Sequence, residues 1–267
     1  MLALFNGWRG TFSHGLHPPE HKDLTANKPI KRLPFPEVVY VPLSQHTGAP
    51  AQALVRPGQE VVRGEPIAKA AGFVSVPMHA PVTGRVREIT GTPTPKGQLV
   101  ASIVIDVYPG ADQSILYGAP QDIDAMTPDE LVAAVQDTGV VGLGGAAFPT
   151  HVKLKVPEGK SVDTIIINAC ECEPYLTTDH RLMVEQPEAV LKGLAVIRKA
   201  LDAEHALIGI EANKPDAAVA LNAAIKPEDR VEVRVVETKY PQGAEKMLIK
   251  SLLDREVPAG GLPADVG

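Results

Sequence analysis

Between residues 162 and 252, short apolar strands alternate with amphipathic helices, and this alternation limits the folds that the chain can adopt. Runs rich in β-branched residues predict three strands, at 162–167, 206–210 and 231–236. A helical pattern follows each strand, beginning at Pro187, Pro215 and Gly243. Because parallel strands need such crossovers, the order predicts an α/β fold with an open, mostly parallel sheet flanked by helices. Ligands of such sheets bind beyond the carboxyl ends of the strands, here the loops 168–178, 211–215 and 237–243.

Residues 37–108 have a different pattern, with short β-rich segments between glycine and proline turns. The predicted strands are 38–41, 61–62, 66–68, 84–89 and 99–107. The turn pattern from Val55 to Gly64, together with the Ala80-Pro81 pair, resembles the half-barrel of biotinyl and lipoyl carrier domains. Those domains place the modified lysine where this chain has Phe73. The resemblance therefore implies a small all-β barrel-sandwich domain, lipoyl-like in fold, that carries no biotinyl or lipoyl group.

These patterns divide the chain into an irregular N-terminal arm (1–36), the barrel-sandwich domain (37–108), a linker (109–126) and an α/β domain (127–267).

A net charge of −6 and an aromatic content of 4% give no support for nucleic-acid binding. No window approaches 18 uncharged apolar residues, so no membrane span is expected. The first five residues are too short for the core of a signal peptide, which predicts that the chain stays in the cytoplasm.

The stretch 142–153 is the clearest candidate for a ligand-binding loop. Small residues dominate its first half, where the glycines are Gly142, Gly144 and Gly145. A loop with few Cβ atoms lets backbone N–H groups approach an anion, and Lys153 adds a mobile positive charge. A capped helix over 127–139 precedes this loop, in place of the strand that an ordinary Rossmann pyrophosphate turn requires. The loop is therefore either a phosphate-binding turn of another kind or a plain tight turn.

Two further loops carry polar groups beyond predicted strand ends. Asn168 ends an apolar strand, where its amide is available to hydrogen-bond a ligand. Glu171 and Glu173 follow as acceptors for ribityl or ribose hydroxyls, the alternative being solvated loop carboxylates. The turn from Tyr240 to Glu245 leads into a predicted helix N-terminus, which favours negative charge, the alternative being a plain helix start.

The chain has two cysteines, Cys170 and Cys172. Two thiolates cannot complete a four-cysteine iron–sulfur site or a tetrahedral metal site, so no cluster is expected in an isolated monomer. The pair is interpreted as small side chains packed near a cofactor, with a redox pair or half of an intermolecular site as alternatives. No metal site is predicted elsewhere, because no cysteine or carboxylate cluster joins the histidines of the arm, His14, His17 and His21.

Taken together, these segments resemble the RnfC component of the Rnf ion-translocating electron-transport complex over nearly the whole chain. The resemblance is carried by His17-Pro18-Pro19-Glu20, His79-Ala80-Pro81 and the stretches 142–153, 168–175, 179–183, 211–215 and 239–243. The α/β part is also similar to the NADH-binding flavoprotein subunit of respiratory complex I. Two departures from that subunit affect the expected cofactor contacts, because Cys170 stands where it has aspartate and Ala244 where it has glutamate.

The similarity to the flavoprotein subunit implies a site for FMN and NADH. Its glycine loop corresponds here to Gly142, Gly144, Gly145, Phe148, Thr150 and Lys153. The other expected contacts are Asn168, Glu171, Glu173, Tyr240, Gly243 and Glu245. The resemblance implies that electrons pass between NADH and iron–sulfur carriers through bound FMN, coupled to ion movement, at the cytoplasmic face of the cell membrane.

The same resemblance implies partners. These are the membrane-embedded and ferredoxin-like subunits of the complex, while [4Fe-4S] clusters are expected only in the full-length family member, because this chain ends before any ferredoxin-type motif. A second hypothesis is a non-catalytic docking module of the same complex that has lost its flavin. A third, a biotin or lipoyl carrier, is disfavoured by Phe73.

Overall fold

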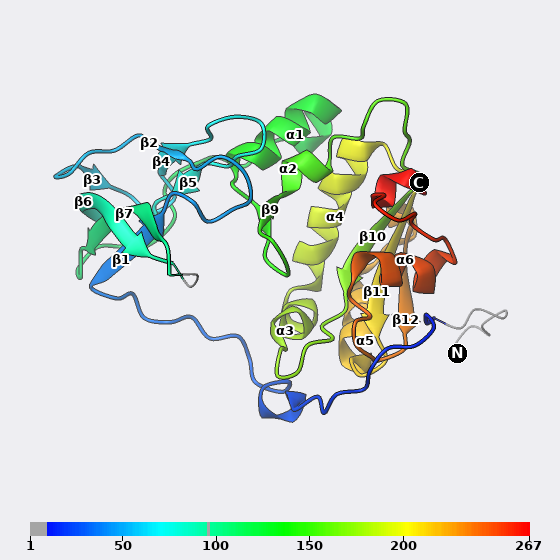
Figure 1. Ribbon diagram of the computed structural model, residues 1–267. Coiled ribbons are helices and arrows are strands. Elements are labelled where there is room, and N and C mark those ends of the chain that lie inside the picture. The colour runs from blue at the N-terminus through cyan, green and yellow to red at the C-terminus, as the bar shows by residue number, and fades with distance from the viewer. Residues whose placement is uncertain (1–9, 95–96) are drawn as a thin grey trace. The chain divides into compact units, whose positions relative to one another are not determined.

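The computed structural model describes residues 10–94 and 97–267 (Figure 1). The expectation that rests on the first five residues therefore lies outside the described residues. By their contacts, the residues form two compact units. The α/β unit comprises the described residues up to Lys31 together with Val156–Gly267, and the sandwich unit is Arg32–Lys155. The four segments expected from the sequence remain a prediction.

The sandwich unit contains two small antiparallel sheets. One has the strand order β1 (Val38–Pro42), β7 (Leu99–Val107), β6 (Gly84–Pro93) and β3 (Glu60–Val61). The other has the order β2 (Gln52–Ala53), β4 (Pro66–Lys69) and β5 (Met78–His79). Their core contains the fully buried Ile67, Ile103 and Ile105. The barrel-sandwich architecture is confirmed, whereas β2 and β5 were not predicted because two-residue strands have no readable periodicity.

Beyond its two sheets, the sandwich unit contains short helices and one short hairpin, joined by irregular segments. Helix α1 (Pro128–Asp137) begins at a capping box, in which the Glu130 carboxylate accepts a 2.7 Å bond from the Thr127 N–H. It ends before Gly139, whose φ of 74° lies in the left-handed region. Strands β8 (Val141–Gly142) and β9 (Phe148–Pro149) then pair, and helix α2 (Thr150–Lys153) follows. The predicted helix is confirmed, and the glycine loop is the tip of the hairpin that comes after it.

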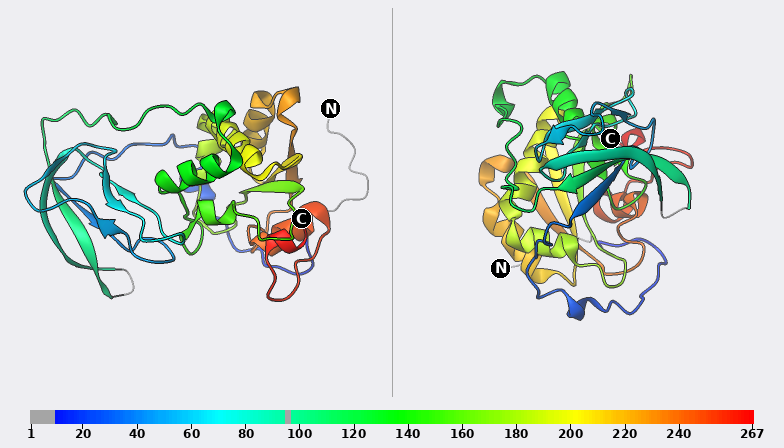
Figure 2. Two further views of the ribbon diagram at one scale, coloured as in Figure 1. Left: turned by 90° about the horizontal axis from the view of Figure 1, so that it is seen from above. Right: turned by 90° about the vertical axis from the view of Figure 1, so that its left-hand side faces the viewer.

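The α/β unit is built on a parallel sheet of three strands, β10 (Thr164–Ala169), β11 (His205–Glu211) and β12 (Val231–Val236), in that order. The helices α3 (Thr178–Glu185), α4 (Pro187–Leu201) and α5 (Pro215–Ala224) cover one face, and α6 (Glu245–Leu253) covers the other (Figure 2). The predicted open parallel sheet is confirmed. Helix α3 was not predicted, because it follows directly on the loop 168–178, and its short sequence has no clear apolar spacing.

Side chains of β11 alternate between the two faces, as expected of a strand buried on both sides. Ile208 and Ile210 pack with the helices α3 to α5, while Leu207 packs with α6. A Cβ atom on Gly209 would lie only 2.9 Å from Leu248 Cδ1 and Leu252 Cδ1, so α6 can approach the sheet this closely only over glycine. Because the three strands are parallel, the loops that follow them all lie at the same edge of the sheet.

Candidate functional site

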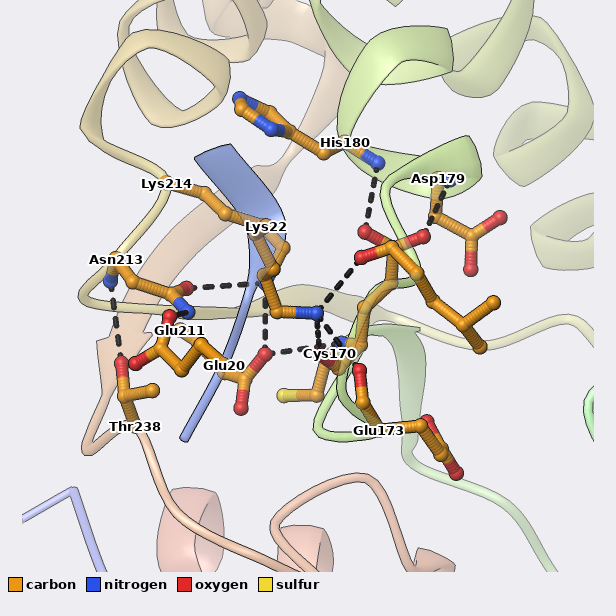
Figure 3. A network of polar contacts seen from close by, with 12 residues as sticks. Glu20, Lys22, Cys170, Glu173, Asp179, His180, Glu211, Asn213, Lys214 and Thr238 are labelled. Atoms are coloured by element: carbon orange, nitrogen blue, oxygen red, sulfur yellow. Dashed lines mark hydrogen bonds and ion pairs between the residues drawn. The ribbon is translucent and has the colours of Figure 1, made fainter. Parts of the chain in front are cut away.

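Polar and charged side chains of the α/β unit gather where the three parallel strands end (Figure 3). Residues 10–31 of the arm lie against the same loops. Together they enclose a cavity of about 30 Å³, which is enough for a single water molecule. Its lining includes Lys22 from the arm, Glu171, Glu211 and Lys239. The position agrees with the general rule for ligand sites in open parallel sheets.

The centre of this cluster is a buried ion pair between Glu211 and Lys214. Both side chains are about 1% exposed, and Lys214 Nζ lies 2.7 Å from Glu211 Oε2. The same carboxylate oxygen accepts a 2.9 Å bond from the Glu171 N–H, while Lys214 also donates to Asn213 Oδ1 at 3.0 Å. Among the described residues, Glu211 Oε1 has no hydrogen-bond partner. The pair therefore joins the ends of β10 and β11.

Glu171 caps a helix. Its Oε1 accepts a 2.7 Å bond from the Asp179 N–H, and its Oε2 accepts a 3.2 Å bond from the His180 N–H. The carboxylate is thus held at the N-terminus of α3, where the helix dipole favours a negative charge. Burial, and after it the charge of Glu171, raises the pKa of Asp179. With 3% of its surface exposed, Glu171 has a structural function that its position in the sequence did not reveal.

Lys22 ties the arm to the loop that follows β10. Its Nζ donates to three backbone carbonyl oxygens, those of Glu171 at 2.7 Å, Glu173 at 2.9 Å and Leu176 at 2.7 Å. Burial, followed by the charge of Lys214, lowers the pKa of Lys22. The Asn213 side-chain amide donates to Glu20 Oε2 at 2.7 Å, so the arm is bonded to a second strand-end loop as well.

Lys239 secures the arm at the end of β12. Its buried ammonium donates to the carbonyl oxygens of Phe12 at 2.5 Å and His14 at 3.1 Å, and lies 4.0 Å from the centroid of the Phe12 ring. Leu16 and Tyr240 exchange backbone hydrogen bonds of 2.8 and 2.7 Å. The arm is therefore an integral part of the α/β unit, although its sequence is irregular.

Asn168 and Gly243 join the end of β10 and the turn before α6. Asn168 Nδ2 donates to the Gly243 carbonyl at 2.7 Å, and Asn168 Oδ1 accepts a 3.2 Å bond from the Cys170 N–H. A Cβ on Gly243 would lie 3.1 Å from the Cys170 carbonyl oxygen, so a larger residue there would crowd this junction. In the structure, the side-chain amide of Asn168 therefore makes its hydrogen bonds within the chain.

Both cysteines are free thiols. Cys170 is buried and Cys172 is half-buried, and burial raises the pKa of each thiol. Within the described ranges, no group of three or more His, Cys, Asp or Glu side chains is placed to hold a metal ion.

The glycine loop lies in the sandwich unit, at the tip of the hairpin β8–β9. Gly144 and Gly145 are exposed, and a Cβ built on either would meet no protein atom within 4 Å. A Cβ on Gly142 would lie 2.8 Å from Lys153 Nζ, so the ammonium sits directly over that glycine. The positive φ in the loop belongs to Ala147, at 50°. The loop thus offers open space beside a positive charge, which suits an anion.

Two family models match the chain. One, described as the RnfC barrel sandwich hybrid domain, matches residues 10–108, and the other, described as the Nuo51 FMN-binding domain, matches residues 135–267. The C subunit of the Na(+)-translocating ferredoxin:NAD(+) oxidoreductase complex of Acetobacterium woodii is 48% identical over 261 residues. The chain belongs to the RnfC family.

A second relative in the RnfC family, from the proton-translocating ferredoxin:NAD(+) oxidoreductase complex of Clostridium ljungdahlii, is 45% identical over 259 residues. The matches cover 97% and 96% of this chain, but only 58% and 56% of the two relatives. The chain therefore spans little more than half the length of these relatives. Among solved structures, an NAD+-reducing [NiFe]-hydrogenase in the air-oxidized state matches with 29% identity and a TM-score of 0.43, over 47% of this chain and 23% of that one.

The residues that the family resemblance implicates in cofactor binding are divided between the two units. Those in the sandwich unit are Gly142, Gly144, Gly145, Phe148, Thr150 and Lys153. Those in the α/β unit are Asn168, Glu171, Glu173, Tyr240, Gly243 and Glu245. Within the sandwich unit, the pairing of β8 with β9 joins Gly142 to Phe148, and Lys153 Nζ lies over Gly142. Within the α/β unit, a hydrogen bond joins Asn168 to Gly243. Their contacts with FMN and NADH remain predictions.

The sequence assigned no individual role to the charged groups that organise the strand ends, although three of them lie in stretches that carry the family resemblance. These groups are Lys22, Glu211, Lys214 and Lys239. One signal was available, because Glu211 directly continues the apolar run of β11 and Lys214 follows three residues later. A charge that extends a fully buried strand needs a nearby partner. No comparable signal marks Lys22, whose carbonyl partners lie about 150 residues away in the chain.

In the described part of the chain, no helix combines the length and apolar character needed to cross a membrane.

Proposed function

We propose that this chain is the flavin-binding electron-transfer part of an Rnf-type complex, in which electrons pass between NADH or NAD+ and iron–sulfur carriers through FMN, coupled to ion movement. The observation that carries the proposal is the match of an FMN-binding domain to residues 135–267, a range that contains the open glycine loop beneath Lys153. The names of the two relatives reported above, subunits of ferredoxin:NAD(+) oxidoreductase complexes, support the same reaction class.

The glycine loop fits the phosphate of FMN. A Cβ on Gly144 or Gly145 would meet no protein atom within 4 Å, which leaves room for a ligand at the loop, and Lys153 supplies the counter-charge. When bound, FMN supplies the chemistry that joins two-electron exchange with a nicotinamide to one-electron transfer. The chain's own residues bind and orient it: Lys153 holds the phosphate, while Phe148 in β9 and Thr150 at the start of α2 follow the loop directly. In the α/β unit, the proposed contacts are Asn168, Glu171, Glu173, Tyr240, Gly243 and Glu245.

The iron–sulfur carriers belong elsewhere in this proposal. Two cysteines cannot ligate a [4Fe-4S] cluster, so we assign the clusters to the remainder of the full-length family member and to ferredoxin-like subunits. The partners are then the other subunits of the complex, membrane-embedded ones included. The proposed location is peripheral, at the cytoplasmic face of the cell membrane.

A second function, a docking module without flavin, is favoured by one specific observation. The polar groups of Asn168 and Glu171, both expected to contact the cofactor, are occupied by hydrogen bonds within the chain. If the strand-end cluster serves only to hold the loops and the arm together, the chain positions partner subunits and needs no cofactor.

Titration of FMN into flavin-free protein, followed by quenching of flavin fluorescence, separates the two functions. We expect binding in the wild type and a loss of about one to two decades in affinity for Lys153→Ala, since a charge-assisted hydrogen bond contributes roughly 1.5–3 kcal/mol. Lys192→Ala is the matched control, because it removes an equally charged side chain that lies exposed on α4, outside the sandwich unit. No binding of FMN to the wild type at high micromolar concentration would favour the docking module.

A further inference from the structure

The glycine loop is held by a residue of the sandwich almost 100 positions earlier in the chain. Thr47 Oγ1 donates to the Ala146 carbonyl at 2.6 Å, and the Thr47 N–H donates to the Ala147 carbonyl at 3.1 Å. Ala147 has a φ of 50°, a left-handed conformation that a residue with a side chain adopts only when its surroundings impose it. Two consecutive carbonyls bonded to one residue are such a constraint.

Thr47 is itself fixed by its neighbours. Gly48 has a φ of 119°, and a Cβ there would lie 2.0 Å from the Val74 carbonyl oxygen, so only glycine allows this approach. The Ala49 N–H donates to the same oxygen at 3.0 Å. The buried His46 ring contacts Ser75 Oγ at 3.3 Å. The turn 46–49 is therefore braced against the hairpin tip 71–76.

That hairpin tip is in turn bonded to the helices on both sides of the glycine loop. On the side of α1, Gln136 Nε2 donates to the carbonyls of Gly72 at 3.2 Å and Ser75 at 3.0 Å. On the side of α2, the fully buried His151 donates from Nε2 to the Phe73 carbonyl at 2.6 Å. The start and the end of the segment 136–151 are thus attached to one small region of the sandwich.

We propose that the sandwich acts as the support that preorganises the glycine loop for an anionic ligand, with Thr47 as its positioning residue. The hairpin tip at Phe73 stands where carrier domains present a swinging lysine, yet here it is held by Gln136 and His151. A hairpin tip with these hydrogen bonds is fixed in place, and it can therefore restrict the movement of the neighbouring glycine loop. A preorganised loop binds its ligand more tightly, because less ordering is left to be done on binding. The inference rests on the proposed function in one respect, the identity of that ligand as the phosphate of FMN.

The test compares three variants of the chain. Thr47→Val removes the hydroxyl but keeps the shape of the side chain, Thr47→Ser restores the hydroxyl, and Thr92→Val is the control, since Thr92 Oγ1 bonds Ser102 within the sheet of the same unit. We expect Thr47→Val to weaken FMN binding about tenfold, the equivalent of one hydrogen bond, and Thr47→Ser and Thr92→Val to bind like the wild type.

A second measurement needs no flavin. Leu143 at the loop tip is 86% exposed, and chymotrypsin cleavage after it reports how freely the loop opens. We expect cleavage of Thr47→Val to be about tenfold faster than that of the wild type, with Thr47→Ser and Thr92→Val unchanged. If cleavage rates and FMN affinity are the same in all variants, the support role is overturned. If the wild type binds no FMN but Thr47→Val is cleaved faster, the proposed function fails while the support role holds.

Discussion

Replacement of Lys214 by methionine tests the central ion pair of the α/β unit. The substitution keeps the length and volume of the buried stem but removes the ammonium that neutralises Glu211. Glu211 is 1% exposed, so bulk water cannot compensate for the lost charge. Removal of one partner from a buried pair typically costs about 3–5 kcal/mol, because it leaves an uncompensated charge.

Differential scanning calorimetry measures the consequence. For a unit of this size, the loss corresponds to a fall of about 10–20 °C in the melting temperature of the α/β unit. Lys192→Met is the control, because Lys192 lies exposed on α4 and its change should shift the melting temperature little. Glu211→Leu should lower the stability about as much as Lys214→Met does, since it leaves the buried ammonium of Lys214 without its counter-charge.

The double variant Lys214→Met with Glu211→Leu distinguishes this reasoning from a simple loss of contacts. With both charges gone, the remaining loss of stability comes mainly from the Glu171 N–H, which no longer has Glu211 as its hydrogen-bond acceptor, and amounts to about 1–3 kcal/mol. The double variant should therefore be more stable than either single variant. Costs that add, or a Lys214→Met protein as stable as Lys192→Met, would refute the assignment of an energetically coupled buried pair.

Three further outcomes are expected. Lys22→Met should speed cleavage by chymotrypsin after the exposed Tyr175, because three carbonyls of that loop lose their hydrogen-bond donor. Mass spectrometry of the fragments locates the cleavage site. An unchanged cleavage rate would mean that the arm does not order the loop. Gly48→Ala should strongly lower the melting temperature of the sandwich unit, since its Cβ would lie 2.0 Å from the Val74 oxygen, while Gly144→Ala, in open space, should leave that temperature unchanged or slightly higher. At pH 8, iodoacetamide should label Cys172 before Cys170, because Cys170 is the more deeply buried thiol and burial raises its pKa; peptide mapping showing the reverse order would contradict the packing around β10.

The sequence by itself determined the features that depend on near neighbours. The spacing of apolar residues set the three parallel strands and their helices, because burial on one or two faces leaves a periodic mark. Thr127 and Glu130 signalled the start of α1, since a capping box is a contact over three residues. Phe73 in place of a lysine predicts a sandwich fold without a carrier group, from the identity of one residue.

Only the tertiary structure decided what the polar residues contact. Glu171 looked like a ligand for a cofactor hydroxyl, and the fold turned it into a cap for a helix whose start the sequence did not reveal. Lys22 and Thr47 carried no local signal at all, because each bonds carbonyl oxygens that are about 100 or more residues away. A carbonyl is present at every residue, so a lysine or threonine that donates to one leaves no pattern in the sequence. Which carbonyl it reaches depends on how the arm, the turns and the strand ends pack together.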